Sequence, residues 1–208
     1  MIRALISDFG GVLTTPLSAG FLAYQEEAPI SLEDLGRGMQ AVAEAYGEHP
    51  LHSLERGEIS EQEFARRLSE QLHDGFDLAR LRELYFERID PNEAMIGFIG
   101  EQRQGGLRTA LLTNNVREWE PLWRAKLPEL DEIFEIVVDS AFVGMRKPEP
   151  AIYELTVERL GAGLRPEQCV FVDDIELNCE AARALGMTAV WFKSSDQAIP
   201  ELESALRE

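Results

Sequence analysis

Three aspartates follow apolar runs in two distant parts of this 208-residue sequence. Asp8 ends the first apolar run and is followed two residues later by Gly10, whereas Asp173 and Asp174 together end a run near the C-terminus. A carboxylate can act as a nucleophile, and paired carboxylates offer the hard oxygen ligands that Mg²⁺ prefers. Because adjacent carboxylates repel each other unless a cation or a basic side chain offsets the cost, the pair predicts a positively charged partner.

Three further polar residues stand where they can serve such carboxylates. Thr113 and Asn114 follow another apolar run, and Lys147, one of only three lysines, precedes a predicted helix. Each residue also has a simpler interpretation: Asp8 as a turn residue, Thr113 as the cap of a helix that begins near Glu118, and Lys147 as a solvent-exposed side chain. Taken singly, none of them specifies a reaction.

Together, these groups match the requirements of nucleophilic attack on a phosphoryl group. The Asp8 carboxylate would be the nucleophile, Thr113 and nearby backbone N–H groups would hold phosphoryl oxygens, and the acids at 173–174 would hold Mg²⁺. Mg²⁺ and Lys147 would keep Asp8 ionised and cancel its repulsion from a phosphate dianion. The hypothesis requires all of these residues to meet at one place.

The elements that must position them form an α/β pattern. From about residue 94 onward, short apolar runs alternate with helical periodicity, which is typical of a parallel sheet covered by helices. Strands are predicted at 5–6, 109–112, 135–138, 169–172 and 189–192, and helices at 94–103, 151–160 and 176–185. In a doubly wound parallel sheet, ligands bind beyond the carboxyl ends of the strands. Asp8, Thr113, Asp139-Ser140 and Asp173-Asp174 are therefore expected to converge.

The segment from 16 to 90 has a different pattern, without a convincing strand. Its apolar residues recur at helical spacing within 32–46, 64–72 and 78–85, and Ser60-Glu61-Gln62-Glu63 is a capping-box sequence. We therefore expect a helical cap domain at 16–90, inserted after the first strand of an α/β core domain formed by 1–15 and 91–208.

The composition argues against several classes of partner. Thirty-eight acidic residues against twenty basic ones give a net charge of −18, which repels nucleic acid and anionic membranes. No run approaches the ~18 apolar residues of a membrane span, so we expect a cytoplasmic protein. Cys169 and Cys179 lack the spacing of a zinc or disulfide framework and are interpreted as buried apolar side chains. A small-molecule partner is expected, and the chain is either a monomer or a homodimer.

Four motifs resemble those of the haloacid dehalogenase-like hydrolase superfamily, in order and spacing, over essentially the whole chain. They are Asp8-Phe9-Gly10-Gly11-Val12-Leu13, Leu112-Thr113-Asn114, Arg146-Lys147-Pro148 and Val172-Asp173-Asp174-Ile175. The insertion at 16–90 is similar to the small helical cap of that superfamily, whose core is a Rossmann-like sheet. The stretches "ERGEIS", "GMRKPEPAIY" and "DDIELNCEAARALGM" resemble bacterial glucose-1-phosphate phosphatases and the N-terminal phosphatase domain of soluble epoxide hydrolase.

The resemblance implies a role for each matching residue. Asp8 would become an aspartyl-phosphate, Thr113 and the backbone N–H of Asn114 would bind phosphate, and Lys147 would orient Asp8 and phosphate. The implied Mg²⁺ ligands are Asp8, the backbone carbonyl of Gly10, and Asp174, with Asp173 behind Asp174 or sharing its role.

Gly10 departs from the pattern of this superfamily. Its phosphatases usually have aspartate at this position, which protonates the leaving group and later activates water. General acid–base help is worth ~10²- to 10⁴-fold in rate. Glycine still supplies the backbone carbonyl, so the change is expected to slow catalysis more than it affects metal binding.

Three functions therefore compete. The main interpretation is a Mg²⁺-dependent phosphatase for a small phosphorylated metabolite, with a sugar phosphate as one candidate. A metal-independent 2-haloacid dehalogenase gains nothing from Asp173 and Asp174, and a phosphonate hydrolase is disfavoured because no lysine precedes Lys126. A catalytically weak binding protein would explain Gly10 but not the retention of the other motifs.

Some residues have a functional and a simpler structural interpretation. The candidate substrate contacts are His49, His52, Arg56, Trp119 and Trp123, for which surface exposure or packing is the simpler expectation. Whether Arg117 and Asn178 touch ligand stays open.

Overall fold

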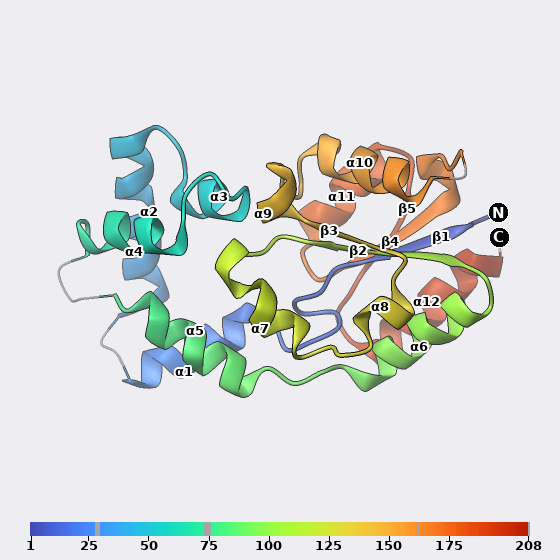
Figure 1. Cartoon of the computed structure of the whole chain (residues 1–208), viewed down its shortest axis with the longest axis horizontal. Helices are drawn as coiled ribbons and strands as arrows, with labels where there is room; N and C mark the ends of the chain where they lie inside the picture. Colours follow the sequence, from blue (N-terminus) through green and yellow to red (C-terminus); the bar gives the residue numbers. More distant parts are fainter. Residues whose placement is uncertain (28–29, 73–75, 162, 208) are drawn as a thin grey trace.

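A five-stranded parallel sheet forms the centre of the computed structural model, which describes residues 1–27, 30–72, 76–161 and 163–207 (Figure 1). The strand order is β3-β2-β1-β4-β5. The strands are β1 (Ala4–Ser7), β2 (Arg108–Thr113), β3 (Ile136–Asp139), β4 (Cys169–Asp173) and β5 (Thr188–Trp191). All five predicted strands are present, and no strand end differs from its predicted position by more than one residue.

Helices cover both faces of the sheet, which is why its central strands are continuous apolar runs (Figure 1). Leu5, Leu111 and Val170 pack with side chains of α6 (Glu93–Gln104) and α12 (Ser195–Arg207). Ile6, Leu112 and Phe171 face the other way, toward α10 (Pro150–Leu160) and α11 (Glu176–Ala184). The doubly wound α/β fold is confirmed. Cys169 and Cys179 are buried in the second of these clusters, as expected.

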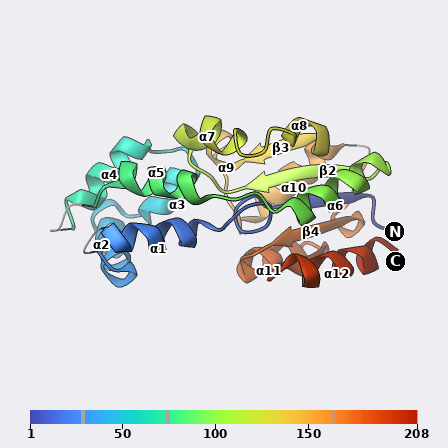
Figure 2. The same cartoon turned by 90° about the horizontal axis from the view of Figure 1, so that it is seen from below.

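Five helices form a separate group beside the carboxyl ends of the strands (Figure 2). They are α1 (Leu17–Glu27), α2 (Leu32–Tyr46), α3 (Pro50–Glu55), α4 (Glu61–Ser69) and α5 (Leu78–Arg88). The helical spacing predicted α2, α4 and α5, and the Ser60 side chain caps α4 by accepting a hydrogen bond from the Glu63 N–H. α1 and α3 were not expected.

The helical group joins the sheet through two adjacent segments. The backbone N–H of Thr15 donates to the carbonyl of Asp90 at 3.0 Å, and Thr14 forms an antiparallel bridge with Pro91. The division into a core of 1–15 and 91–208 and a cap of 16–90 is therefore retained as a proposal.

Short elements complete the described chain. They are η1 (Arg117–Trp119), α7 (Glu120–Arg124), α8 (Leu130–Ile133), α9 (Ser140–Val143) and η2 (Pro166–Gln168). Thr113 ends β2 and does not cap a helix, because Val116 is the residue at the N-terminal boundary of η1. Trp119 and Trp123 belong to η1 and α7, and both are buried. In the part of the chain that the structure describes, no helix has the length and apolarity needed to cross a membrane.

Candidate active site

Asp8 and Asp173 are brought together by the pairing of β1 with β4. The parallel register sets Ser7 opposite Val172, and the backbone N–H of Asp8 donates to the carbonyl of Val172 at 3.0 Å. Both aspartates therefore leave the same edge of the sheet. The sequence prediction that polar residues converge there depends on the shared direction of parallel strands, and the structure agrees for this pair.

Lys147 lies between these two acids. Its Nζ atom is 2.7 Å from Oδ1 of Asp8 and 2.6 Å from Oδ2 of Asp173. The lysine side chain is only 1% exposed, so its interpretation as a solvent-facing residue is wrong. A buried ammonium group with two carboxylate partners is the positively charged group that the acid pair predicted.

The two neighbouring aspartates have different surroundings. Asp173 is fully buried, and its carboxylate accepts hydrogen bonds from Asn178 Nδ2 at 3.0 Å and from the Ile175 N–H at 2.8 Å, in addition to its ion pair. Asp174 is only partly buried and extends toward Gly11, where a Cβ atom would overlap its Oδ2 atom. Asp173 is thus held by protein groups, whereas Asp174 faces the loop that follows Asp8.

Carboxylate oxygens of Asp8, Asp173 and Asp174 all lie within 4.8 Å of one another. Burial raises the pKa of Asp8 to about 8, against the opposing effect of Lys147, and burial together with Asp173 raises the pKa of Asp174 to about 6. Three acids with one lysine leave negative charge uncompensated. An all-oxygen donor set of this charge fits a divalent cation such as Mg²⁺.

Thr113 and Asn114 stand at the end of β2, next to β1. Thr113 is 2% exposed. The Asn114 side chain forms two hydrogen bonds with the Lys147 backbone: its Nδ2 donates to the carbonyl at 2.9 Å, and its Oδ1 accepts from the N–H at 2.8 Å. Sequence reasoning considered only the Asn114 backbone N–H and missed this link. The amide side chain therefore ties the Lys147 loop to β2.

Asn178 and Arg117, whose contacts the sequence left open, both bind protein groups. Asn178 lies on α11, one turn beyond the acid pair, and holds Asp173. Its place in the first turn of the helix that follows the acids is the sequence signal that could have found it. Arg117 donates to the Ala141 carbonyl at 2.6 Å.

The helical group of α1 to α5 contacts the rest of the chain close to Lys147. Arg146 Nε lies 2.6 Å from Oε2 of Glu55, and each side chain is 15% exposed. Gly57 adopts a φ of +67°, and a Cβ atom there would overlap the carbonyl oxygen of Ala141, so this turn sits directly on α9. The helical group therefore lies against the edge of the sheet that carries the acids.

The expected substrate-contact residues of the cap and its neighbourhood have structural partners. Arg56 pairs with Glu48 and Glu149, and the rings of His49 and His52 lie 4.7 Å apart. Trp119 Nε1 donates to Glu61 at 3.0 Å, and Trp123 packs against Phe9 with ring centroids 5.2 Å apart. Packing and ion pairs thus account for Arg56 and the tryptophans. The two histidines are half-buried rather than exposed, and among the described residues the His49 Nδ1 atom is buried without a hydrogen-bond partner.

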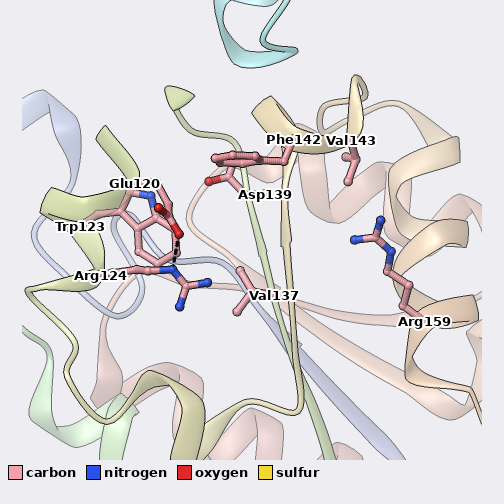
Figure 3. Close-up of a pocket in the computed structure, with 8 residues that line it drawn as sticks. All are labelled: Glu120, Trp123, Arg124, Val137, Asp139, Phe142, Val143 and Arg159. Carbon is pink, nitrogen blue, oxygen red and sulfur yellow. Dashed lines mark hydrogen bonds and ion pairs between the residues drawn. The ribbon is translucent and has the colours of Figure 1, made fainter. Parts of the chain in front are cut away.

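Asp139 and Ser140 take no part in the acid cluster. The Asp139 carboxylate caps α9 by accepting from the Ala141 N–H at 3.0 Å, and Ser140 Oγ accepts from the Asn115 N–H. Asp139 lines a separate hollow of about 240 Å³ at the β3 edge, together with Trp123 and Arg124 (Figure 3). Burial raises the Asp139 pKa to about 7, because its Oδ2 atom is buried without a hydrogen-bond partner among the described residues.

The fold and this site define a class of α/β hydrolases built around an aspartate that follows the first strand. The sequence profile of haloacid dehalogenase-like hydrolases matches residues 2–186, and the chain belongs to this family. The protein is therefore a hydrolase.

The chain aligns with different shares of the length of its relatives. Bifunctional epoxide hydrolase 2 of Rattus norvegicus is 27% identical over 97% of this chain, which spans 38% of that protein. A phosphorylated carbohydrates phosphatase of Thermotoga maritima is 30% identical, with 91% of this chain and 84% of the relative aligned. A family enzyme of Bacteroides thetaiotaomicron, solved in complex with magnesium and inorganic phosphate, has the same fold. It shares 24% identity, with a TM-score of 0.66 over 93% of this chain and 95% of its own.

Proposed function

We propose that the protein is a Mg²⁺-dependent phosphatase that acts on a small phosphorylated metabolite through an aspartyl-phosphate intermediate. This proposal rests on the cluster of Asp8, Asp173 and Asp174, in which the buried ammonium group of Lys147 pairs with Asp8 and Asp173. The Thermotoga maritima relative, a phosphatase of phosphorylated carbohydrates, supports a sugar phosphate as the substrate class.

Asp8 is the proposed nucleophile. Lys147 holds its Oδ1 atom, which also accepts a hydrogen bond from the Phe9 N–H at 2.7 Å, so the other oxygen is left to attack phosphorus. Attack forms a bond between the carboxylate oxygen and phosphorus and breaks the bond from phosphorus to the leaving oxygen. Water then hydrolyses the acyl phosphate and regenerates the carboxylate.

Phosphate binding is assigned to Thr113, to the backbone N–H of Asn114 and to Lys147. The Asn114 side chain supports this assignment because it holds the Lys147 backbone in place through two hydrogen bonds. Donors fixed before the substrate arrives need no reorganisation as charge develops.

Mg²⁺ would be held by Asp8, Asp174 and the backbone carbonyl of Gly10, with Asp173 behind them. When bound, the ion supplies positive charge that offsets the phosphate dianion and the carboxylates around it. The hydrogen bonds that occupy Asp173 and the position of Asp174 beside Gly11 favour Asp174 as the direct ligand. The cap at 16–90 would close the site against bulk water.

One experiment tests the reaction class. Purified protein is incubated with p-nitrophenyl phosphate or with 2-chloropropionate, in Mg²⁺ or in EDTA. We expect phosphate release that requires Mg²⁺ and is lost in Asp8→Asn, while Asp196→Asn, at an exposed position of α12, retains it. Chloride release that persists in EDTA would instead identify a dehalogenase. Absence of release from a broad panel of phosphate esters would support a binding protein.

The covalent intermediate has its own test. Protein quenched in acid during turnover of a ³²P-labelled ester should retain label that hydroxylamine removes, because acyl phosphates react with hydroxylamine. Asp8→Asn should retain no such label.

A further inference from the structure

The hydroxyl group of Tyr85 lies above Gly10. Tyr85 belongs to α5 of the cap and is 7% exposed. Its hydroxyl oxygen is 4.0 Å from the position that a Cβ atom would occupy at Gly10. Among the described residues, Gly10 and its two chain neighbours apart, no atom comes closer to that position. The Tyr85 hydroxyl group therefore lies beside the open space that a side chain at residue 10 would enter.

Packing fixes the Tyr85 side chain in this position. Its Cα atom lies 2.9 Å from the position of a Cβ atom at Gly20, so only glycine permits this approach between α1 and α5. The ring also packs against Phe86 and Trp119, with centroids 5.0 and 6.2 Å away. A hydroxyl group on a side chain held from three directions is pre-organised.

The surroundings keep this hydroxyl group protonated. Burial is the main cause that raises the Tyr85 pKa to about 12. A side-chain hydrogen bond with Thr14 opposes this rise, and the charges of Asp8 and Asp174 add to it. The phenol beside Gly10 is therefore a hydrogen-bond donor at neutral pH.

In-line attack determines where the leaving group must point. Asp8 approaches phosphorus from the carboxyl edge of the sheet, so the bond that breaks points away from the sheet and toward the cap. Tyr85 is a polar cap residue whose hydroxyl group reaches the loop that follows Asp8.

We propose that the Tyr85 hydroxyl group donates a hydrogen bond to the leaving oxygen of the phosphate ester, a role for which Gly10 has no side chain. This inference rests on the proposed phosphatase function. As the Asp8–phosphorus bond forms, the electron pair of the breaking bond passes to the leaving oxygen. That oxygen takes a proton from water while Tyr85 retains its own.

The hydrogen bond should matter most for poor leaving groups, because these develop the most charge on oxygen. The test compares the wild type with Tyr85→Phe on glycerol 3-phosphate, phenyl phosphate and p-nitrophenyl phosphate. We expect kcat/KM to fall about 10- to 100-fold for the alkyl ester, with a change of less than about threefold for p-nitrophenyl phosphate. Tyr24→Phe is the matched control, because Tyr24 is a buried cap tyrosine whose hydroxyl group binds the Asp77 N–H.

Gly10→Asp provides a second, independent measurement. The open space at Gly10 accommodates a side chain, and an aspartate there would serve the same leaving oxygen. We expect Gly10→Asp to raise alkyl ester turnover more in the Tyr85→Phe background than in the wild type, because the two groups replace each other.

The outcomes separate this inference from the proposed function. Three outcomes would overturn the role of Tyr85 while leaving the proposed function in place. These are an equal loss of kcat/KM for all three esters in Tyr85→Phe, no loss in Tyr85→Phe, and an equal effect of Gly10→Asp in both backgrounds. A wild-type protein that hydrolyses no phosphate ester would overturn the proposed function and this inference with it. Circular dichroism and thermal unfolding identify any variant that fails to fold. If Tyr85→Phe fails, Tyr85→Leu, which also lacks the hydroxyl group and has a smaller side chain, takes its place in the Gly10→Asp comparison.

Discussion

The Nζ atom of Lys147 lies 2.6 Å from Oδ2 of Asp173, and neither side chain is more than 1% exposed. The same ammonium group reaches Asp8 at 2.7 Å. A single buried cation thus offsets part of the charge of two acids that come from different strands. The proposed chemistry therefore uses a lysine that also pairs with two acids inside the fold.

Replacing Lys147 by methionine should therefore affect both properties. Lys147→Met leaves two buried carboxylates without their partner, which costs on the order of 3 kcal/mol of the free energy of unfolding. The loss should shrink at low pH, where the acids are protonated. Urea unfolding at pH 5 and pH 8 measures this loss of the free energy of unfolding. Phosphatase activity of Lys147→Met should fall at least ~100-fold. Lys193→Met, at an exposed lysine, is the control, and equal effects of the two changes would contradict the prediction.

Replacing Gly11 should disturb the position of Asp174 as well as the backbone conformation. Its φ of +83° strains any L-residue, and a Cβ atom would also displace Oδ2 of Asp174. Gly106 has a φ of +92° with nothing within 4 Å of its Cβ position, so Gly106→Ala carries the strain alone. We expect both alanine variants to lose about 1 kcal/mol of stability, while only Gly11→Ala loses Mg²⁺ affinity. Titration calorimetry with MgCl₂ decides, and unchanged affinity in Gly11→Ala would exclude Asp174 as a ligand.

Asp173 and Asp174 should respond differently to the same substitution. Asp173→Asn breaks the Lys147 ion pair and should cost about 2 to 3 kcal/mol of stability. Asp174→Asn should lower Mg²⁺ affinity at least ~10-fold. At pH 8 it should also stabilise the metal-free fold, because the raised pKa of Asp174 shows that its charge is unfavourable there. Thermal unfolding with and without MgCl₂ measures both effects, and the reverse pattern would assign direct ligation to Asp173.

Asp139 should make the protein less stable as pH rises. The pKa of Asp139 is about 7 in the folded chain, against a reference value of 3.8 for an unperturbed aspartate. Between these two pH values the folded state binds more protons than the unfolded state, so the free energy of unfolding falls as pH rises. Asp139→Asn should therefore be more stable than the wild type at pH 8 by on the order of 1 to 3 kcal/mol, and the difference should vanish near pH 4. Asp131→Asn, at an 89% exposed side chain, should show no such trend in urea unfolding.

Much of the sheet could be predicted from the sequence, because each strand contains a contiguous apolar run, and β1 to β4 end at a polar residue. The short helix α3 and the helix α1 could not, since α3 has only six residues and α1 packs through Gly20 against a helix far away in sequence. Helices of this kind depend on their partners more than on local signals.

By itself, the sequence determined that Asp8, Thr113 and Asp173 share one edge, because parallel strands all end at the same side of their sheet. Only the tertiary structure decided that Lys147 is shared between Asp8 and Asp173, that Asn114 fixes the Lys147 backbone, and that Tyr85 stands over Gly10. These contacts join residues from separate elements, so they depend on how loops and helices pack and leave no periodic pattern in the chain.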